Sequence, residues 1–515
     1  MRVATAEEMR EIDRKTIQDF GTPSLELMER AGSIVADVVM RMYRGRSITV
    51  IAGGGNNGGD GLVTARLLKK AGIDAKAFLV SDEESLSPDC RFQYRAALEN
   101  GIRVEIRKHI SAGDIQDSVV IDALFGTGLN KPVSGPFLDI IKTVNERGSP
   151  VVSIDVPSGI SADNGQVLGQ AIRADLTVSF GLPKIGHLLH PGAEYAGKLI
   201  VENIGFPDEL LNDPSLKHHL IERLTVRSLI PKRKPDSHKG VYGHVMVLAG
   251  SAGKTGAAFL ASRACMRAGA GAVTIGVPDV LFPIFQTRVL EEMTIPLQSH
   301  ESGTFSMHAS QKALDFIHAK ADTVLIGPGI GVSDDVIQFV KEIVIHAGKP
   351  LLIDADALNC IAVDPDILRK TSSEVVITPH PNEMKRLLGR QYPDITGQEV
   401  NRRRIEIARS FAAEKKVICV LKGAPTVVAS PDGSAYINSS GNPGMATAGA
   451  GDVLSGVISA FLAQGMSALN AAICGVYLHG LAGDIARDEL GEYSLIAGDL
   501  IRHLPGAFRF LHTLG

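Results

Sequence analysis

Residues 51–72 read IAGGGNNGGDGLVTARLLKKAG. The apolar run SITVIAG (47–53) predicts a β-strand, the glycines predict a tight turn, and the residues after them predict a helix. Further apolar runs alternate with helical segments in the first half of the chain: DAKAFLV (74–80), SVVIDALF (118–125), PVVSIDV (150–156) and LTVSF (176–180). Continuous apolar strands that alternate with helices are typical of a parallel sheet covered on both faces.

The second half repeats this alternation after a weakly patterned stretch that begins past Leu210 and includes the basic, proline-flanked segment 231–235. Its apolar runs are HVMVLAGS (244–251), GAVTIGVP (271–278), TVLIGPG (323–329), PLLIDAD (350–356), VVITPHP (375–381) and VICVLKG (417–423). We therefore expect an α/β protein with two tandem domains, bounded at 1–220 and 225–515.

Composition narrows the class of function. The chain has 515 residues, of which 44% are hydrophobic and 21% charged, so disorder and coiled-coil rods are poor explanations. The formal net charge of -4 provides no broad positive electrostatic field that would attract nucleic acid or anionic lipid. We expect a protein that acts on small molecules and has no nucleic-acid or membrane partner.

The cysteines and the N-terminus bear on location. The five cysteines are odd in number, lie far apart and show no C-x-x-C spacing: Cys90, Cys265, Cys360, Cys419 and Cys474. The N-terminal sequence is too charged for the core of a signal peptide, and no apolar run approaches the roughly 20 residues that span a bilayer. These observations favour a reducing compartment, and we expect the protein to be cytoplasmic.

The first glycine-rich loop allows more than one interpretation. Its glycines at 53–58 have the spacing G-x-G-x-x-G of a dinucleotide-binding turn, and Asp82 follows about twenty residues later. The same glycines could serve only to make a tight turn. Asn56, Asn57 and Asp60 add three polar side chains to the loop, so we expect it to hold a cation or polar ligand as well as phosphate.

Two aspartates end neighbouring apolar runs. Asp122 follows VVI, and Asp155 follows VVSI. The carboxyl ends of parallel strands meet at one edge of a sheet, so both side chains and the glycine-rich loop can converge on one crevice. Either aspartate alone could simply cap the next helix, but their combination with the loop favours a site.

The second half carries its strongest signal near the C-terminus. The run from Asn442 to Asp452, NPGMATAGAGD, leads directly into an apolar helix. Small residues at a helix start expose backbone N–H groups, which suits a transferring phosphoryl group, and an aspartate there could accept a hydroxyl proton. Asp452 could otherwise be an ordinary helix cap. The string GSAGKT (250–255) is not a P-loop, because Leu248 stands where that motif needs glycine.

The motifs of the first half resemble a known family over essentially residues 1–215. GGGNNGGDG, DALFGTGL, DVPSG and SFGLPK (179–184) are similar to the N-terminal epimerase domain of the bifunctional NAD(P)H-hydrate repair enzymes. The resemblance implies a Rossmann-like three-layer sandwich in which two loops and Asp155 contact the substrate: Asn56, Asn57, Gly58, Gly59, Asp60, Gly126, Thr127, Gly128, Leu129, Asn130, Lys131 and Pro132. It also implies a potassium ion on Asn57, Asp122 and Ser158, in keeping with the preference of hard cations for oxygen ligands.

The strings of the second half resemble the ribokinase-like, ADP-dependent NAD(P)H-hydrate dehydratases over about 235–515. They are GSAGKTGAA, GPGIG (327–331), DADALN (354–359), TPHPNEM (378–384), LKGAPTVV (421–428) and TAGAGD (447–452). The resemblance assigns Ala257, Gly331, His380 and Asp452 to the hydrated dinucleotide. It assigns these residues to the adenine nucleotide: Lys422, Gly423, Ala424, Pro425, Thr426 and Gly451. His380 could be a plain loop histidine, and His187 and His190 are expected to be surface or core residues.

The resemblance implies an isomerase and a lyase in one chain, which repairs NADH or NADPH that has taken up water (NADHX and NADPHX). The first domain would interconvert the R and S hydrates, with Asp155 as acid or base. The second would transfer phosphate from ADP to the hydroxyl of the S hydrate through Asp452. Loss of that phosphate would restore NAD(P)H and leave AMP, with magnesium at the nucleotide phosphates. We also expect a homo-oligomer.

Two other functions fit parts of the sequence. A vitamin-type kinase fused to a nucleotide-binding dehydrogenase would explain GAGD and G-x-G-x-x-G, but not the pair Asn56 and Asn57 or the strings TPHPNEM and DADALN. Alternatively, the first half could be a nucleotide-sensing or scaffolding module without catalytic activity. An epimerisation assay on the isolated 1–220 fragment distinguishes these possibilities.

Overall fold

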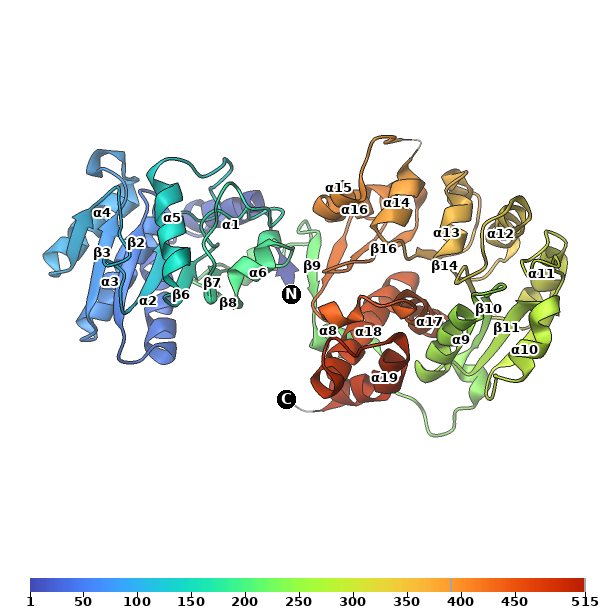
Figure 1. The fold of residues 1–515 in the computed structure, drawn as a ribbon. Helices are drawn as coiled ribbons and strands as arrows, with labels where there is room; N and C mark the ends of the chain where they lie inside the picture. Colours follow the sequence, from blue (N-terminus) through green and yellow to red (C-terminus); the bar gives the residue numbers. More distant parts are fainter. Residues whose placement is uncertain (390, 514–515) are drawn as a thin grey trace. The chain divides into compact units, whose positions relative to one another are not determined.

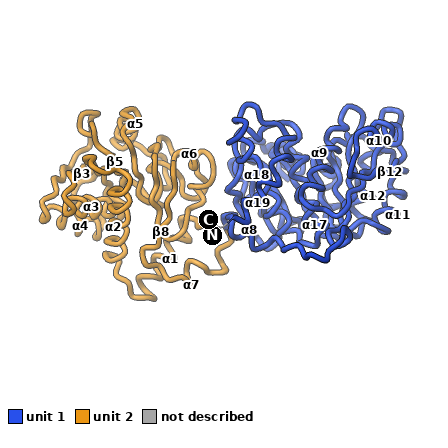
Figure 2. Tube along the Cα trace, turned by 90° about the horizontal axis from the view of Figure 1, so that it is seen from below, with its two compact units in different colours: residues 1, 219–515 blue, residues 2–218 orange. Residues whose placement is uncertain are grey.

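The computed structural model describes residues 1–389 and 391–513. The chain divides into two compact units, shown in different colours in Figure 2: an N-terminal unit of residues 2–218 and a C-terminal unit of residues 219–515 together with Met1. Figure 1 gives the elements of each.

A parallel sheet of seven strands forms the centre of the N-terminal unit, in the order β4-β3-β2-β5-β6-β7-β8. The strands are β2 (Ser47–Ala52), β3 (Ala75–Leu79), β4 (Arg103–Ile106), β5 (Ser118–Ala123), β6 (Val151–Ile154), β7 (Leu176–Phe180) and β8 (Lys198–Glu202), and the short β1 is Arg2–Val3. The helices are α1 (Ala6–Gln18), α2 (Ser24–Met42), α3 (Asn56–Lys70), α4 (Pro88–Glu99), α5 (Pro136–Arg147), α6 (Gly192–Ala196) and α7 (Asp208–Leu211).

Alternating residues of β5 show how the layers form. Val119 and Ile121 pack with α2, α3 and α4 in one core, whereas Val120 packs with α5 in another. All three are fully buried, which is why the strand is apolar on both faces. The predicted three-layer arrangement is confirmed. At the chain start, Thr5 and Glu8 form a capping box at the start of α1.

The C-terminal unit is built on a larger sheet, in the order β9-β18-β17-β16-β15-β14-β13-β10-β11-β12. Its strands are β9 (His218–Ile221), β10 (His244–Leu248), β11 (Ala272–Pro278), β12 (Met293–Leu297), β13 (Thr323–Ile326), β14 (Leu351–Ile353), β15 (Val375–Ile377), β16 (Ile418–Leu421), β17 (Val427–Ala429) and β18 (Ala435–Asn438). The strands from β12 to β16 in this order are parallel, and the β16-β17-β18 pairings are antiparallel.

Helices cover this sheet on both sides. Those of the C-terminal unit are α8 (Arg223–Leu229), α9 (Thr255–Arg267), α10 (Phe282–Gln286), α11 (Ala309–Lys320), α12 (Asp334–His346), α13 (Asp356–Ile361), α14 (Pro381–Leu388), α15 (Gly397–Arg402), α16 (Arg404–Lys415), α17 (Ala450–Ala463), α18 (Ala468–Leu490) and α19 (Ala497–His512). One apolar core joins α9, α17, α18 and α19 to the sheet (Figure 1). Among the described residues, α18 alone is long and apolar enough to cross a membrane, and 72% of its apolar window is buried in this core.

Each sheet reverses its direction of winding at one place. In the N-terminal unit β2 lies between β3 and β5, and in the C-terminal unit β10 lies between β11 and β13. At such a switch point the loops after two adjacent strands run in opposite directions and leave a crevice at the carboxyl ends of the strands. The glycine-rich loops at 53–55 and 250–254 both lie at these positions.

All five cysteines are buried and none is in a disulfide. Burial raises the pKa of Cys90, Cys360 and Cys474 to about 12, and it also raises the pKa of Cys265 and Cys419. A thiol with so high a pKa carries almost no thiolate at neutral pH, so these cysteines serve as small apolar core residues.

Candidate active sites

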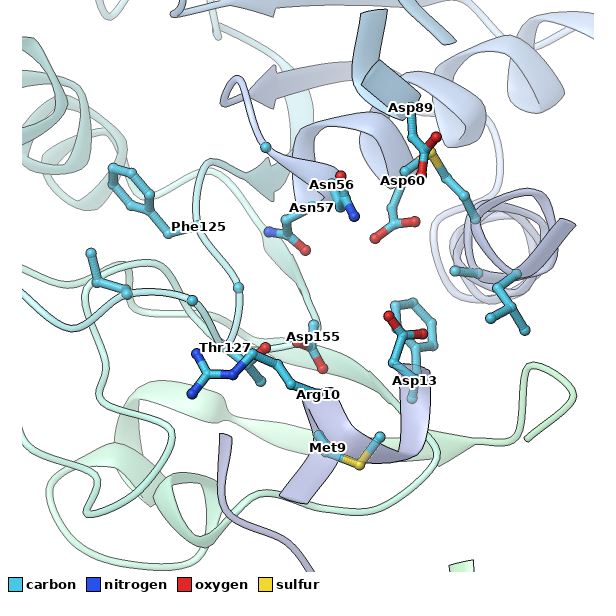
Figure 3. A pocket seen from close by; sticks show the side chains of 18 of the residues that line it. Met9, Arg10, Asp13, Asn56, Asn57, Asp60, Asp89, Phe125, Thr127 and Asp155 are labelled. Atoms are coloured by element: carbon cyan, nitrogen blue, oxygen red, sulfur yellow. The ribbon is translucent and has the colours of Figure 1, made fainter. Parts of the chain in front are cut away.

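A cavity of about 700 Å³ opens at the switch point of the N-terminal unit (Figure 3). It is bounded by the loops after β2 and β5, by α1 and α2, and by the segment that follows β7. Most of the residues that the sequence analysis assigned to the epimerase substrate line it: Asn56, Asn57, Asp60, Gly126, Thr127, Gly128, Leu129, Asn130, Lys131 and Asp155. The two loops and Asp155 therefore meet at this cavity, whereas Asp122, which was predicted to join them, is not among the lining residues.

Gly58, Gly59 and Pro132 are not among the lining residues. The two glycines lie in the first turn of α3 and let the backbone pack closely: a Cβ at Gly58 would stand 1.9 Å from the carbonyl oxygen of Gly53. At Gly58 the clash is with the backbone, so no larger residue fits there, whereas at Gly59 a Cβ would meet the side chain of Met28 at 2.7 Å.

Asp155 directly follows β6 in a left-handed conformation, with φ of 65°. Its Oδ1 accepts a hydrogen bond of 2.6 Å from Nζ of Lys184 and one of 3.3 Å from Oγ of Ser179. Burial alone would raise the pKa of Asp155, but the Lys184 ammonium outweighs burial and lowers it. Asp155 is therefore a carboxylate, held at the cavity wall.

Asp122 lies near the end of β5 and is 1% exposed. Its oxygens accept hydrogen bonds from Oγ of Ser153 at 2.8 Å, and from the backbone N–H of Ser158 at 2.9 Å and Oγ of Ser158 at 2.6 Å. Burial nevertheless raises the pKa of Asp122.

Within the described part of the chain, neither amide atom of the Asn57 side chain has a hydrogen-bond partner, although both are buried. Such a pair of unsatisfied polar atoms is costly unless a ligand contacts it.

Three further carboxyl groups line the same cavity. Asp60 points into it, and Asp13 and Asp89 lie close by (Figure 3). Burial, together with the charges of Asp155 and Asp13, raises the pKa of Asp60 well above its usual value. The sequence analysis found Asp60 but missed Asp13, Asp89 and Lys184. Asp82, the acidic residue expected of a dinucleotide site, is exposed, pairs with Lys108 at 2.9 Å and does not line the cavity.

In the C-terminal unit, Lys422 lies at the centre of a buried polar cluster. Its Nζ is 2.8 Å from Oδ1 of Asp354 and 3.8 Å from Oε2 of Glu383, and Oγ of Ser455 donates to Asp354. Burial opposes the charge of Lys422, but the two carboxylates prevail and raise its pKa. A Cβ at Gly451 would stand 3.3 Å from the same Nζ. Lys422 and Gly451, which the sequence analysis assigned to the nucleotide, are therefore neighbours.

Asp452 is in the first turn of α17. Burial raises its pKa to about 7, the charge of Asp354 adds to this effect, and Lys422 opposes it. A carboxyl group with a pKa near the working pH can both accept and release a proton, which is what a general base requires. The preceding Gly449 has φ of 87°, so the chain turns sharply just before the first exposed N–H groups of the helix.

The remaining predicted residues of this unit come from neighbouring loops. The backbone N–H of Gly331 donates to Asp356 at 2.9 Å, and Lys254 forms an ion pair with the same carboxylate at 2.9 Å. Ala257 is in the first turn of α9, whose preceding loop carries Lys254. Lys254 therefore joins the loop after β10 to the start of α13, which follows β14.

His380 caps α14. Its ring Nδ1 accepts a hydrogen bond of 3.1 Å from the backbone N–H of Asn382. The backbone N–H of His380 donates a hydrogen bond of 2.7 Å to Oε2 of Glu383. Burial lowers the pKa of His380, so the ring is neutral at neutral pH. His380 thus has a structural role at the start of α14, where it forms a capping box with Glu383.

The segment Gly423–Thr426 follows β16. Arg404, 4% exposed, lies against it and donates to the carbonyl oxygen of Pro425.

No group of three or more histidine, cysteine, aspartate or glutamate side chains suited to a metal ion occurs among residues 1–389 and 391–513.

Comparison with known proteins covers both units. A family model described as NAD(P)H-hydrate dehydratase matches residues 245–505, and one described as YjeF-related protein N-terminus matches residues 24–186. The bifunctional NAD(P)H-hydrate repair enzyme of Thermofilum pendens is 40% identical over 517 residues, which cover 99% of this chain and 97% of that protein. The chain belongs to the family of bifunctional NAD(P)H-hydrate repair enzymes.

Two more relatives agree with the assignment. The bifunctional NAD(P)H-hydrate repair enzyme of Moorella thermoacetica is 39% identical over 99% of this chain and 97% of its own length. The crystal structure of the ADP/ATP-dependent NAD(P)H-hydrate dehydratase from Bacillus subtilis, co-crystallised with ATP and Mg²⁺, aligns with a TM-score of 0.50 and 31% identity over 57% of this chain and 99% of that one. The family, the two-domain α/β fold with a ribokinase-like second part and the repair function predicted from the sequence are thereby confirmed.

Proposed function

We propose that the two crevices divide the repair of NAD(P)H hydrate between them. The N-terminal cavity interconverts the R and S hydrates, and the C-terminal crevice restores NAD(P)H from the S hydrate with ADP as phosphoryl donor. The observation that carries the proposal is that each unit has an aspartate in a different electrostatic environment: Asp155 is held as a carboxylate by Lys184 at the N-terminal cavity, and Asp452 has a pKa of about 7 beside Lys422.

In the C-terminal unit, Asp452 accepts the proton of the substrate hydroxyl as the oxygen attacks the terminal phosphorus of ADP. AMP leaves, and the new phosphate ester is a far better leaving group than hydroxide. Its loss as phosphate, together with loss of a proton from the neighbouring ring carbon, creates the double bond of the nicotinamide ring. The N–H groups at the start of α17 and the ammonium of Lys422 are placed to stabilise the negative charge of the phosphoryl group.

In the N-terminal unit, Asp155 acts as acid or base at the hydroxyl-bearing carbon of the ring: it accepts the hydroxyl proton and returns it once the configuration has inverted. The substrate lies between residues 56–60 and 126–132, in a cavity that α1 and α2 line with apolar side chains as well as with Arg10 and Asp13. The apolar part suits a ring, since binding cavities combine an apolar wall with a few convergent polar groups.

Potassium fits the oxygens below this cavity. The buried Oδ1 of Asn57 has no hydrogen-bond partner among the described residues, and Asp122 and Ser158 add carboxylate and hydroxyl oxygens. We propose that these three residues hold the ion. When bound, it would supply positive charge beside the substrate.

Magnesium fits a nucleotide-bound form of the C-terminal site. The carboxylates of Asp354 and Glu383 are oxygen donors near Lys422, and Mg²⁺ in such enzymes is held by one or two carboxylates together with phosphates. A nucleotide would provide the missing ligands. Magnesium would offset the charge of the transferring phosphoryl group.

The test of the proposed function is direct. The purified chain is supplied with a mixture of the two NADPH hydrates, a magnesium salt, potassium chloride and either ADP or ATP, and the recovery of nicotinamide absorbance is followed. Complete recovery is expected, at a rate above that of spontaneous epimerisation. Recovery of only half of the substrate at the enzymatic rate would show that the N-terminal unit is not an epimerase. The expected cytoplasmic location and homo-oligomeric state stay predictions.

A further inference from the structure

Lys184 is a charged side chain in a place that normally excludes charge. Its side chain is 2% exposed, and burial of an ammonium group costs several kcal/mol unless the group is paired and fully hydrogen-bonded. Its Nζ donates to Oδ1 of Asp155 at 2.6 Å, to Oγ of Ser179 at 2.8 Å and to the carbonyl oxygen of Phe180 at 3.0 Å. These are all three of the bonds that an ammonium can donate.

The backbone around Lys184 is held as firmly as its side chain. The N–H of Lys184 donates to Nδ1 of His187 at 3.1 Å, and burial lowers the pKa of that ring to about 4, so it remains a neutral acceptor. On either side, Ala4 pairs with the chain: its N–H donates to Pro183 at 3.0 Å and its carbonyl oxygen accepts from Ile185 at 3.1 Å. The lysine is therefore fixed before any substrate arrives.

This arrangement determines which part of Asp155 faces the substrate. Oδ1 is occupied by Lys184 and Ser179, whereas Oδ2 lies toward the loop after β5, since a Cβ at Gly126 would stand 3.3 Å from it. The side chain of Asp155 is 15% exposed, so the small exposed area is at the cavity. One oxygen is thus held by the protein and the other remains for the reaction.

We propose that Lys184 is a positioning residue of the epimerase, which holds one carboxylate oxygen of Asp155 so that the other oxygen faces the reacting hydroxyl group. The proposal rests on the proposed role of Asp155. A lysine that only filled space would need neither three donated bonds nor a partner at the cavity wall. Catalytic groups misplaced by about 1 Å lose on the order of 10²-fold in rate, so the loss of Lys184 should reduce turnover rather than substrate binding.

The first experiment compares Lys184→Ala with Lys108→Ala in the full chain, with potassium chloride at saturation. Lys108 also pairs with an aspartate in the N-terminal unit, but at the surface, where the ion pair contributes little. For Lys184→Ala we expect kcat of epimerisation to fall about 10²-fold with KM within twofold of the parent value. Lys108→Ala should be unchanged in both. Parent-like kcat in Lys184→Ala, or a rise in KM alone, would overturn the proposal.

The second experiment uses chemical rescue. The substitution leaves space next to the cavity, and methylammonium can donate hydrogen bonds from that space whereas tetramethylammonium cannot. Added methylammonium should restore part of the lost kcat in Lys184→Ala and leave the parent enzyme unaffected, and tetramethylammonium should restore none. A folded Lys184→Ala variant that methylammonium fails to restore would show that the lysine contributes packing alone.

Folding and the role of Asp155 are tested in parallel. Dehydration of the pure S hydrate by the same samples reports on the C-terminal unit, and thermal unfolding reports on the N-terminal unit. If Lys184→Ala does not fold, Lys184→Met keeps most of the volume: a loss of kcat supports the proposal and an unchanged kcat overturns it. Normal epimerisation by Asp155→Asn would instead refute the proposed role of Asp155. Loss in Asp155→Asn with normal turnover in Lys184→Met would refute the inference alone.

Discussion

Burial raises the pKa of Asp452 to about 7, which makes the dehydration sensitive to pH in the neutral range. A general base must be ionised to accept a proton, so kcat/KM for dehydration should fall as the pH drops below about 7, by roughly tenfold for each pH unit. Rates measured with the pure S hydrate between mildly acidic and mildly alkaline pH check this. A profile that stays flat through pH 7 would contradict the assignment.

Substitution of the same residue gives a second prediction. Asp452→Asn keeps the shape of the side chain but cannot accept the hydroxyl proton, so dehydration should fall by a factor of ~10²–10⁴ while nucleotide binding persists. Single-turnover rates and the increase in melting temperature on adding ATP measure the two effects. The epimerase of the same chain provides the control. Near-normal dehydration would remove Asp452 from the chemistry.

Asp122→Ala should act on the other reaction. It removes one proposed potassium ligand, so the potassium concentration that half-activates epimerisation should rise by at least about tenfold, while dehydration of the S hydrate is unchanged. It also leaves the hydrogen-bond donors of Ser153 and Ser158 without their acceptor, which should destabilise the N-terminal unit by about 1–3 kcal/mol. Equal loss of both activities would indicate a general folding defect instead.

Single residues differ in how well the sequence predicts them. The positions of Asp155 and Asp452 were predictable because each stands next to a strong local pattern, a strand end in one case and a small-residue helix start in the other, while their catalytic roles stay predictions. Lys184 was not, although the string that contains it was recognised, because its role depends on an acceptor 29 positions earlier in the chain. The carboxylates Asp354 and Glu383 were missed for the same reason: their shared partner Lys422 is distant in sequence.

The first turn of α3 provides a prediction at the level of an element. Alanine usually stabilises a helix by about 1 kcal/mol relative to glycine, but a Cβ at Gly58 would meet the carbonyl oxygen of Gly53 at 1.9 Å. The clash should prevail, and Gly58→Ala should destabilise the N-terminal unit by about 1–3 kcal/mol. At Gly55, where no atom lies within 4 Å, alanine should change stability by less than about 0.5 kcal/mol. Urea unfolding of both variants measures the difference.

Strands in the middle of each sheet were predictable, and those near the edges were not. The apolar runs of β2, β5, β6, β7, β10 and β13 are buried on both faces, which makes them visible in the sequence. β4, β8 and β12 are partly exposed, so their sequences lack a continuous apolar run. The antiparallel pairing of β17 with β18 was also missed, because three to four residues per strand are too few to show a period.

At the level of the whole molecule, the two units should function when separated. The structure divides the chain between residues 218 and 219, and α8 packs against α18 and α19, so the second fragment must begin before Arg223. With mixed epimers and ADP, the 219–515 fragment should convert the S hydrate rapidly and the R hydrate at the spontaneous rate. Addition of the 1–218 fragment should remove the slow phase. Persistence of that phase with a folded fragment would make the N-terminal unit a binding module.

The buried thiols allow each unit to report on its own opening. Cys90 is the one cysteine in residues 2–218, and its Sγ lies 3.8 Å from the carbonyl oxygen of Gly53 in the loop that borders the cavity. A thiol-specific reagent can reach it only when that region opens, so its labelling rate under native conditions gives the free energy of local opening. Potassium or a substrate analogue that closes the loop should slow the labelling of Cys90 and leave the other four cysteines unaffected. Thiol labelling kinetics can therefore detect ligand binding to the epimerase without any assay of its reaction.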